Sequence, residues 1–181
     1  MRAFEDVRQA LLAAAEPVAE IESVPTAAAL GRVLAAGQVS GLAVPPLDNS
    51  YMDGYAVSAA DVPVAGTRLK VSQRIPAGSV GRSLEAGTAA RIFTGAPIPH
   101  GGDAVVMQEL CEVDGDSVVI NHVPRAGEWV RRAGEDIALG QTVLPAGVRL
   151  NPQMLGMAAS VGCASLPVFR RLKVALFSTG D

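Results

Sequence analysis

The sequence has few residues that could bind a soft metal or act as a nucleophile. It contains only two cysteines, Cys111 and Cys163, and two histidines, His100 and His122. The cysteines stand in no CxxC pair, which argues against a zinc site, and neither histidine lies in a motif typical of a catalytic triad. We expect buried cysteines and structural or surface histidines. The chemistry that remains belongs to carboxylates, hydroxyls and backbone amides, which suit Mg²⁺ and oxyanions.

The sequence also lacks a concentration of positive charge and a long apolar run. Its net charge is -3, with acids and bases scattered along the chain, so nucleic acid is not an expected partner. No stretch reaches the roughly 20 apolar residues that span a bilayer. Charges at Glu5, Asp6 and Arg8 interrupt the N-terminal segment, which is therefore not a signal peptide. We expect a soluble, cytoplasmic protein with no membrane partner.

The first thirty residues predict a helix followed by shorter elements. Apolar residues recur at helical spacing between positions 3 and 15, so this range predicts an amphipathic helix whose apolar stripe needs a partner. Residues 18–24 predict a short strand. Thr26 is the expected N-cap of a short helix that continues through Leu30.

Between Gly41 and about Gly140, proline and glycine recur and the apolar segments become short, alternating or β-branched. This pattern is typical of strands joined by tight turns. The expected strands are Leu69–Gln73, Ala90–Phe93, Ala104–Gln108, Ser117–Asn121 and Gln141–Leu144. The expected turns are Pro76–Gly78, Val113–Asp116 and Pro145–Gly147. We therefore predict a β-rich domain.

A second helix is predicted to begin at Pro152. Asn151 is a good capping residue, proline suits the first helical position, and apolar residues then recur at helical spacing. Residues 165–169 and 172–177 predict strands, and the second is a nearly continuous apolar run typical of a strand buried in a parallel sheet. Because Ser-Thr-Gly-Asp follows this run, we expect the chain to stop at the start of a further α/β unit.

Three loops combine polar side chains with residues that restrict or free the backbone. Residues 45–56, PPLDNSYMDGYA, can hold polar groups in place; alternatively, Asp48 and Asn49 bond their own backbone in a capped turn. Residues 91–97, RIFTGAP, can present amides and a hydroxyl to an oxyanion, or form a plain strand-end turn. Residues 131–136, RRAGED, place two guanidiniums beside two carboxylates, or form a surface ion-pair cluster of small energetic value.

Four ordered segments resemble those that mark the MoeA family and the related gephyrin E domain. They are DNSYMDGYAV (48–57), RIFTGAPIPHGGDAVVMQE (91–109), VRRAGEDI (130–137) with GVRL (147–150) downstream, and KVALFSTGD (173–181). The resemblance covers almost the whole chain. It implies a molybdopterin molybdenumtransferase of molybdenum cofactor biosynthesis. Such an enzyme takes adenylylated molybdopterin and molybdate, releases AMP and leaves molybdenum on the dithiolene, with Mg²⁺ assisting.

The resemblance implies a mixed α and β fold in which the chain passes back and forth between domains. Residues 21–39 and 141–168 would form an elongated dimerisation domain, with residues 40–140 inserted as a β-rich domain. Residues 1–20, with the N-terminal helix, and residues 169–181, with the terminal strand, would belong to a truncated MogA-like α/β domain that binds the pterin. The resemblance therefore implies a homodimer whose chain, lacking most of the pterin-binding domain, does not turn over alone.

Site residues are implied where the family's motifs stand. The catalytic candidates are Asp53, Thr94 and Asp136, and the cofactor-binding candidates are Arg131, Arg132 and Asp181. Asp53 and Asp136 would hold Mg²⁺ directly or through water, whereas Thr94 and Arg131 would bind phosphate or molybdate oxygens. The sequence departs from the family at Ala133, where relatives often carry another basic residue, and this weakens the expected anion site.

Two functions of different class follow from these observations. In the first, the chain supplies part of the active site of an enzyme. In the second, it is a non-catalytic dimerisation or interaction module whose loops are structural. The terminal segment, Phe177–Asp181, favours the first function, because a free-standing module would hardly end within a buried strand and its loop.

Overall fold

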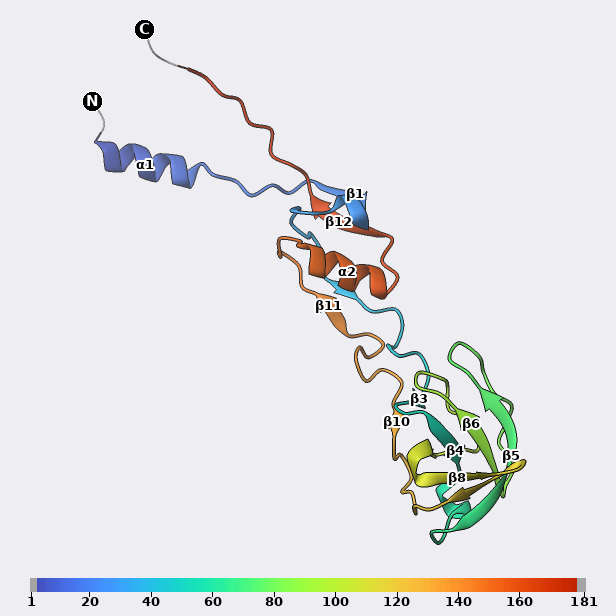
Figure 1. The fold of residues 1–181 in the computed structure, drawn as a ribbon. Coiled ribbons are helices and arrows are strands. Elements are labelled where there is room, and N and C mark those ends of the chain that lie inside the picture. Colours follow the sequence, from blue (N-terminus) through green and yellow to red (C-terminus); the bar gives the residue numbers. More distant parts are fainter. Residues whose placement is uncertain (1–2, 179–181) are drawn as a thin grey trace. The chain divides into compact units, whose positions relative to one another are not determined.

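The computed structural model describes residues 3–178, which form a mixed α and β fold divided into two units (Figure 1). Unit 1 comprises the residues up to Ser40 together with those from Thr142 onward, and unit 2 comprises Gly41–Gln141. Separate clusters of buried apolar residues form the cores of the two units. Among residues 3–178, no helix is long and apolar enough to cross a membrane.

The α-helices are α1 (Phe4–Ala13) and α2 (Pro152–Ser160). The strands are β1 (Ile21–Pro25), β2 (Gln38–Val39), β3 (Asn49–Ser50), β4 (Gly54–Val57), β5 (Thr67–Ile75), β6 (Thr88–Ile92), β7 (Ala104–Met107), β8 (Cys111–Asp114), β9 (Ser117–Ile120), β10 (Val130–Arg131), β11 (Thr142–Leu144) and β12 (Ser165–Phe169). Three short 3₁₀ helices are η1 (Thr26–Ala28), η2 (Ala59–Asp61) and η3 (Gln108–Leu110).

Unit 1 is built from two small antiparallel sheets and helix α2. Strand β1 pairs with β12, and β2 pairs with β11, so segments from both ends of the sequence lie side by side. Helix α2 begins as predicted, because Asn151 Oδ1 accepts a hydrogen bond of 2.9 Å from the backbone N of Met154. Leu34, Leu150 and Leu166 are among the fully buried residues of this unit.

The predicted capping role of Thr26 is wrong. Residue Pro25 precedes the 3₁₀ helix η1, which ends at Ala28 and has no side-chain cap. The Thr26 hydroxyl instead donates a 2.5 Å hydrogen bond to the carbonyl of Cys163, which follows α2. A contact between residues distant in the sequence therefore replaced the local bond that the motif suggested.

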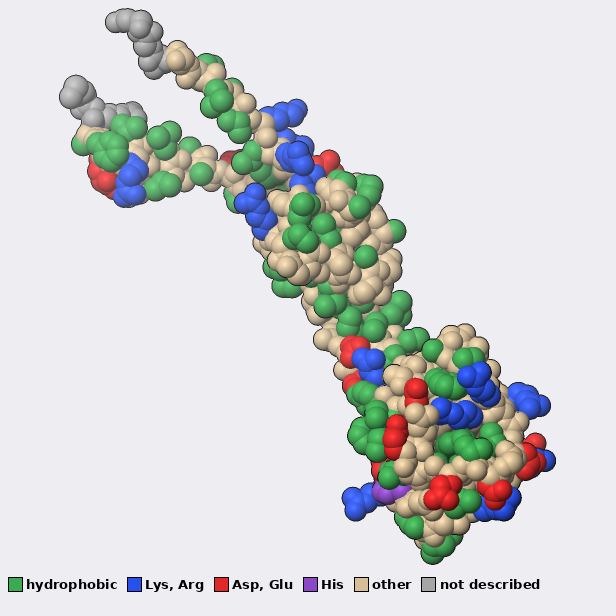
Figure 2. All heavy atoms as spheres, in the orientation of Figure 1, with side chains coloured by type: hydrophobic (Ala, Val, Ile, Leu, Met, Phe, Trp, Pro, Cys, Tyr) green, Lys and Arg blue, Asp and Glu red, His purple; other side chains and the backbone are tan. Residues whose placement is uncertain are grey.

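The predicted strand at residues 172–177 is also wrong, because this segment has no regular secondary structure. Its apolar side chains are exposed, with Leu176 at 91% and Phe177 at 88%. Helix α1 forms, but none of its residues is buried. Figure 2 shows hydrophobic side chains along both segments. A strand buried on both faces needs neighbouring strands, and no described residue supplies one here.

Unit 2 contains a six-stranded sheet in the order β7-β4-β6-β5-β9-β8. All its neighbours are antiparallel except β5 and β6, which are parallel. The strands predicted at 69–73, 90–93, 104–108 and 117–121 are confirmed with small shifts of their ends. The expected turn after Val113 joins β8 to β9, with Gly115 at φ 63°.

Strand β8 and the central strand β4 were not predicted from the sequence, and most of β4 lies within the predicted first loop. All four residues of β4 are buried, and the strand lies between β6 and β7. A Cβ added at Gly54 would stand 1.9 Å from the Val106 carbonyl oxygen, so glycine permits the close approach of β4 and β7. Four buried residues without alternation give little local signal of a strand.

Candidate functional site

The three loops singled out in the sequence meet at strand β3 of unit 2. One edge of β3 pairs with β10, where Arg131 lies opposite Asn49. Its other side contacts the second loop, because Gly95 N donates to the Ser50 carbonyl at 2.8 Å and Ser50 N donates to the Ala96 carbonyl at 2.9 Å. Two residues of the first loop therefore hold the second and third loops on either side.

Asp53 and Thr94 form the closest contact between the first two loops. Asp53 Oδ1 accepts hydrogen bonds from both the backbone N and the hydroxyl of Thr94, each of 2.8 Å. Gln108 N also donates to the Asp53 carbonyl at 3.0 Å, which fixes the backbone just before β4. The Thr94 amide is the main cause that lowers the pKa of Asp53, followed by the Thr94 hydroxyl. Asp53 is therefore held as a carboxylate.

Arg91 provides a cation beside this pair without forming an ion pair with Asp53. Its Nη1 donates to the carbonyls of Gly54 and Ile92 at 2.8 and 3.0 Å, and its Nη2 donates to Gln108 Oε1 at 2.6 Å. These bonds hold the guanidinium in place. Its charge also contributes to the lowered pKa of Asp53.

Asp48 ties the first loop to the third. Its Oδ1 accepts a 2.8 Å hydrogen bond from Ala133 N, and its Oδ2 accepts a 2.6 Å bond from Arg132 Nη1. The Ala133 amide is the first cause of the lowered pKa of Asp48. The capped-turn alternative for the first loop is therefore wrong for Asp48, whose carboxylate bonds residues more than 80 positions away.

The acidic residues of the third loop neutralise its first arginine. Arg131 pairs with Asp136 through Nη2, and its Nε lies 3.7 Å from Glu135 Oε1. The Tyr51 hydroxyl donates to Glu135, and this bond is the first cause that raises the pKa of Tyr51. Asp136 likewise raises the pKa of Arg131. Arg131 is thus already paired with acidic side chains, and its predicted binding of phosphate or molybdate oxygens stays a prediction.

The structure brings five of the six candidate residues onto loops that share β3. They are Asp53, Thr94, Arg131, Arg132 and Asp136. The sixth, Asp181, lies outside the described residues. Asp53 faces Thr94 and Asp136 faces Arg131, and within residues 3–178 no group of three or more His, Cys, Asp or Glu side chains could hold a metal ion.

Asp48, Tyr51, Arg91 and Glu135 also belong to this network, although none was a candidate. Each lies within one of the motifs quoted above, and its place in a motif is the sequence feature that could have identified it. Their roles depend on partners in other loops, and sequence spacing does not reveal such partners.

Among the described residues, neither the cysteines nor the histidines hydrogen-bond to a candidate residue. Both cysteines are half-buried and free, and burial raises the pKa of Cys111 to about 11. His122 lies 2.7 Å from Glu128 Oε1, and His100 is exposed in a turn.

Comparisons with known proteins agree with the motifs. The model of the MoeA N-terminal region (domain I and II) matches residues 2–162. The chain is 44% identical over 164 residues to molybdopterin molybdenumtransferase 2 of Mycobacterium tuberculosis, covering 88% of this chain and 40% of the relative. It is 43% identical over 167 residues to molybdopterin molybdenumtransferase of a Nostoc species, covering 90% and 38%. The chain thus spans about two fifths of the length of these relatives.

The fold is also similar to that of solved MoeA proteins. A crystal structure of a molybdopterin biosynthesis MoeA protein from Pyrococcus horikoshii superposes with a TM-score of 0.85 at 32% identity, over 92% of this chain and 44% of that chain. The match in sequence extends over most of unit 1 and all of unit 2. The chain therefore belongs to the MoeA N-terminal region family.

Proposed function

We propose that this chain forms the N-terminal part of a molybdopterin molybdenumtransferase, which inserts molybdenum from molybdate into adenylylated molybdopterin and releases AMP. The observation that carries the proposal is the meeting of the three loops at β3, because the loops that bear Asp53, Thr94 and the RRAGED segment are bonded to one another there. The relatives are named molybdopterin molybdenumtransferases, and the adenylylated substrate and the release of AMP are what the resemblance in the motifs implies.

In this proposal, Asp53 is the carboxylate of the first loop that accepts a proton or a hydrogen bond at the active site. Thr94 holds its carboxylate through two donors, so Oδ1 is occupied while Oδ2 has no protein donor within residues 3–178. A carboxylate kept ionised in this way can accept a proton or orient a water molecule at the substrate. Thr94 acts as the residue that positions Asp53, and its hydroxyl is not free for an oxyanion as long as this bond persists.

The third loop is the proposed anion-binding element. Arg132 pairs with Asp48, and Arg131 pairs with Asp136 and Glu135. Because these pairs are substantially exposed, each contributes little to stability and can exchange for a phosphate or molybdate oxygen. In the absence of substrate, Asp136 then holds the Arg131 side chain in place through their ion pair.

Magnesium does not fit the described residues as a protein-ligated ion. Asp136 is engaged by Arg131, and within residues 3–178 Asp53 belongs to no group of three or more carboxylate, histidine or cysteine side chains that could hold a metal ion. Mg²⁺ usually keeps several waters and takes ligands from substrate phosphates. No step of the proposal depends on an ion held by this chain.

We also propose that unit 1 is the dimerisation domain and that the chain acts as a homodimer. A pocket of ≈ 540 Å³ beside α2 is lined mainly by small apolar residues, including Ala27, Gly156 and Ala159. Such a surface allows close approach of a second backbone. In the same proposal, α1 and the exposed apolar residues from Leu172 to Phe177 belong to a further α/β domain of the full-length enzyme.

The proposal is tested in a chimera of the Nostoc relative whose matching region is replaced by residues 2–162 of this chain. AMP release and molybdenum incorporation are measured with adenylylated molybdopterin and molybdate. We expect the chimera to be active and Asp53→Ala to reduce the rate by about a hundredfold, as a misplaced catalytic contact does. Asp114→Ala, which removes an exposed carboxylate paired with Arg68, is the matched control.

The alternative function, a non-catalytic dimerisation or interaction module, gives a different result. If the loops are purely structural, an active and folded chimera keeps its rate when Asp53 is replaced. That outcome would assign the chemistry entirely to the remaining part of the enzyme.

A further inference from the structure

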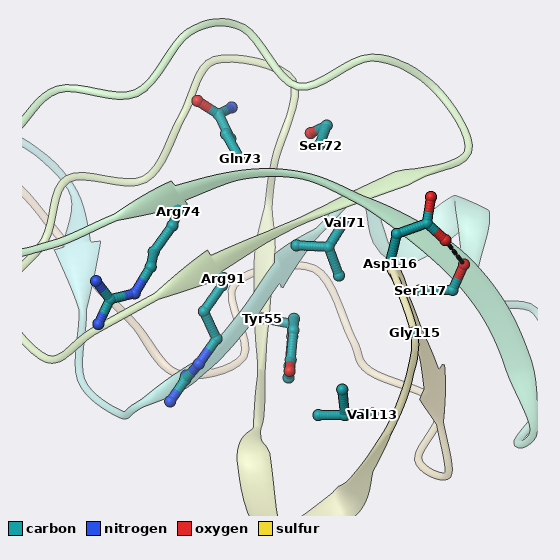
Figure 3. A pocket seen from close by; sticks show the side chains of 10 residues that line it. All are labelled: Tyr55, Val71, Ser72, Gln73, Arg74, Arg91, Val113, Gly115, Asp116 and Ser117. Atoms are coloured by element: carbon teal, nitrogen blue, oxygen red, sulfur yellow. Dashed lines mark hydrogen bonds between the residues drawn. The ribbon is translucent and has the colours of Figure 1, made fainter.

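Unit 2 carries a pocket that includes none of the six candidate residues. Its volume is ≈ 460 Å³, and its lining includes Arg74 and Arg91 at one end, Tyr55, Val71 and Val113 along the middle, and Asp116 at the other end (Figure 3). This size lies within the range of small-molecule sites. The pocket combines two cations, an apolar wall and a hydrogen-bond acceptor.

The two arginines are direct partners on neighbouring strands. Arg74 of β5 lies opposite Arg91 of β6, and the pairing register shifts between Val71 and Gln73. This β-bulge turns Ser72 and Gln73 to one side of β5 and Arg74 to the side of Val71, as Figure 3 shows. Without the bulge, the alternation of the strand would point Arg74 away from Arg91.

Like charges directly opposite each other destabilise a sheet. Neither guanidinium forms an ion pair with a carboxylate of the described residues. Both instead lie over the ring of Phe93, at 4.5 Å for Arg74 and 4.4 Å for Arg91. The ring offsets part of the repulsion, but neither guanidinium is paired directly with a carboxylate of residues 3–178.

The side chains of the two arginines differ in how firmly hydrogen bonds hold them. Three hydrogen bonds hold the Arg91 guanidinium in place, whereas the guanidinium of the exposed Arg74 has no hydrogen-bond or ion-pair partner among residues 3–178. Arg74 can therefore also contact an anion that binds Arg91, because moving the Arg74 guanidinium breaks no hydrogen bond or ion pair. Figure 2 shows Lys and Arg side chains gathered over the part of unit 2 where β5 and β6 lie.

The rest of the pocket defines the uncharged part of a ligand. Val71, Val113 and the Tyr55 ring form an apolar wall next to the arginines. At the far end, Asp116 accepts a hydrogen bond of 3.2 Å from the Ser117 hydroxyl and retains acceptor capacity. A ligand that fills the pocket has an anionic group at one end and a donor such as a hydroxyl at the other.

We propose that this pocket is a second ligand site, which binds the phosphate monoester of a small polyol. Arg74 and Arg91 bind the phosphate, the carbon skeleton lies on the apolar wall, and a hydroxyl of the ligand donates to Asp116. A dianionic phosphate suits this end because it neutralises both guanidiniums and offers several acceptor oxygens. The site includes none of the six candidate residues, but it shares Arg91 with the network around Asp53.

The experiment is calorimetric titration of the 181-residue chain with ribose 5-phosphate, with inorganic phosphate and with ribose as the uncharged control. We expect saturable binding of ribose 5-phosphate, weaker binding of phosphate and no binding of ribose. Arg74→Ala should weaken both interactions about tenfold, the usual scale for one charge-assisted contact. Asp116→Asn should weaken binding of ribose 5-phosphate but leave that of phosphate unchanged.

Arg82→Ala is the matched control, because Arg82 is an exposed arginine of the same unit that lines a different pocket. Equal loss of affinity in Arg82→Ala and Arg74→Ala would mean unspecific attraction of phosphate to the surface and would overturn the proposed site. Unchanged binding in Arg74→Ala, or no saturable binding by the wild-type chain, would overturn it as well. Arg91→Lys adds a test of geometry, since it keeps the charge but loses the fixed donors. If that variant does not fold, the comparison of Arg74→Ala with Arg82→Ala still decides the question.

Discussion

Asp53 and Thr94 are joined by two hydrogen bonds that end on a single oxygen, Asp53 Oδ1. One donor is the backbone amide of Thr94, which any residue but proline provides, and the other is its hydroxyl. The pair connects the end of the first loop with the turn after β6. Its strength can therefore be divided experimentally into a backbone part and a side-chain part.

Thr94→Val should raise the pKa of Asp53 only part of the way toward its ordinary value. The valine removes the hydroxyl donor, whereas the amide, which is the larger cause of the shift, remains. Carboxyl ¹³C chemical shifts followed against pH measure this change. The pKa of Asp48 should stay where it is, because its donors are Ala133 and Arg132. An Asp53 pKa that does not move would show that the hydroxyl contributes nothing.

The chain should lose stability as the pH falls below about 4. Asp48, Asp53 and Glu128 all have lowered pKa values in the folded state, against ordinary values of 3.8 for aspartate and 4.5 for glutamate. Each group stabilises the fold above its unfolded pKa, and this contribution is lost as the pH falls through the folded pKa. Urea unfolding between pH 7 and pH 2 measures the effect, and a constant free energy of unfolding below pH 4 would contradict it.

Asp48→Asn should destabilise unit 2 by about 0.5–1 kcal/mol at pH 7. The change removes the negative charge that accepts from Ala133 N and Arg132, and the loss is small because solvent screens an ion pair that is more than a third exposed. Asp114→Asn, which breaks the exposed pair with Arg68, is the control and should have almost no effect. Equal effects of the two variants would show that Asp48 does not tie the loops together.

Gly54→Ala should destabilise unit 2 by roughly 1–3 kcal/mol, because the added methyl meets the Val106 backbone and one strand must move. Gly41→Ala in the same unit meets nothing within 4 Å and should be nearly neutral. Urea unfolding measures both. Since Asp53 precedes Gly54, we also expect chemical-shift changes at Thr94 in the first variant; a neutral Gly54→Ala would mean that the β4–β7 approach is not restrictive.

Ala159→Glu should convert a dimer of the chain into a monomer. Ala159 is exposed on α2 and lines the small-residue pocket of unit 1, so a charge there can oppose close approach of a second chain without disturbing the core. Light scattering at high micromolar concentration gives the mass. Ala65→Glu, at an exposed turn of unit 2, should leave the mass unchanged. A wild-type chain that is monomeric under these conditions would contradict the proposed homodimer.

Local chemistry made part of the fold predictable. The N-cap of α2 depends on Asn151 and an amide three residues later, and the β8–β9 turn depends on Gly115. Both are bonds or conformations within a few residues, so the sequence alone carries them. The predicted strand at residues 172–177 failed for the opposite reason. An apolar run becomes a strand only when another strand pairs with it, and no partner lies within the described residues.

The sequence by itself determined the family, the capped start of α2, most strands of unit 2 and the loops that carry the candidate residues. Only the tertiary structure decided that Asp53 faces Thr94, that Asp48 reaches Ala133, and that a bulge sets Arg74 beside Arg91. The reason is physical. Helix caps and turns are satisfied by neighbours in the chain, whereas strand register is set by the packing of whole sheets, and a shift of one residue turns a side chain to the opposite face.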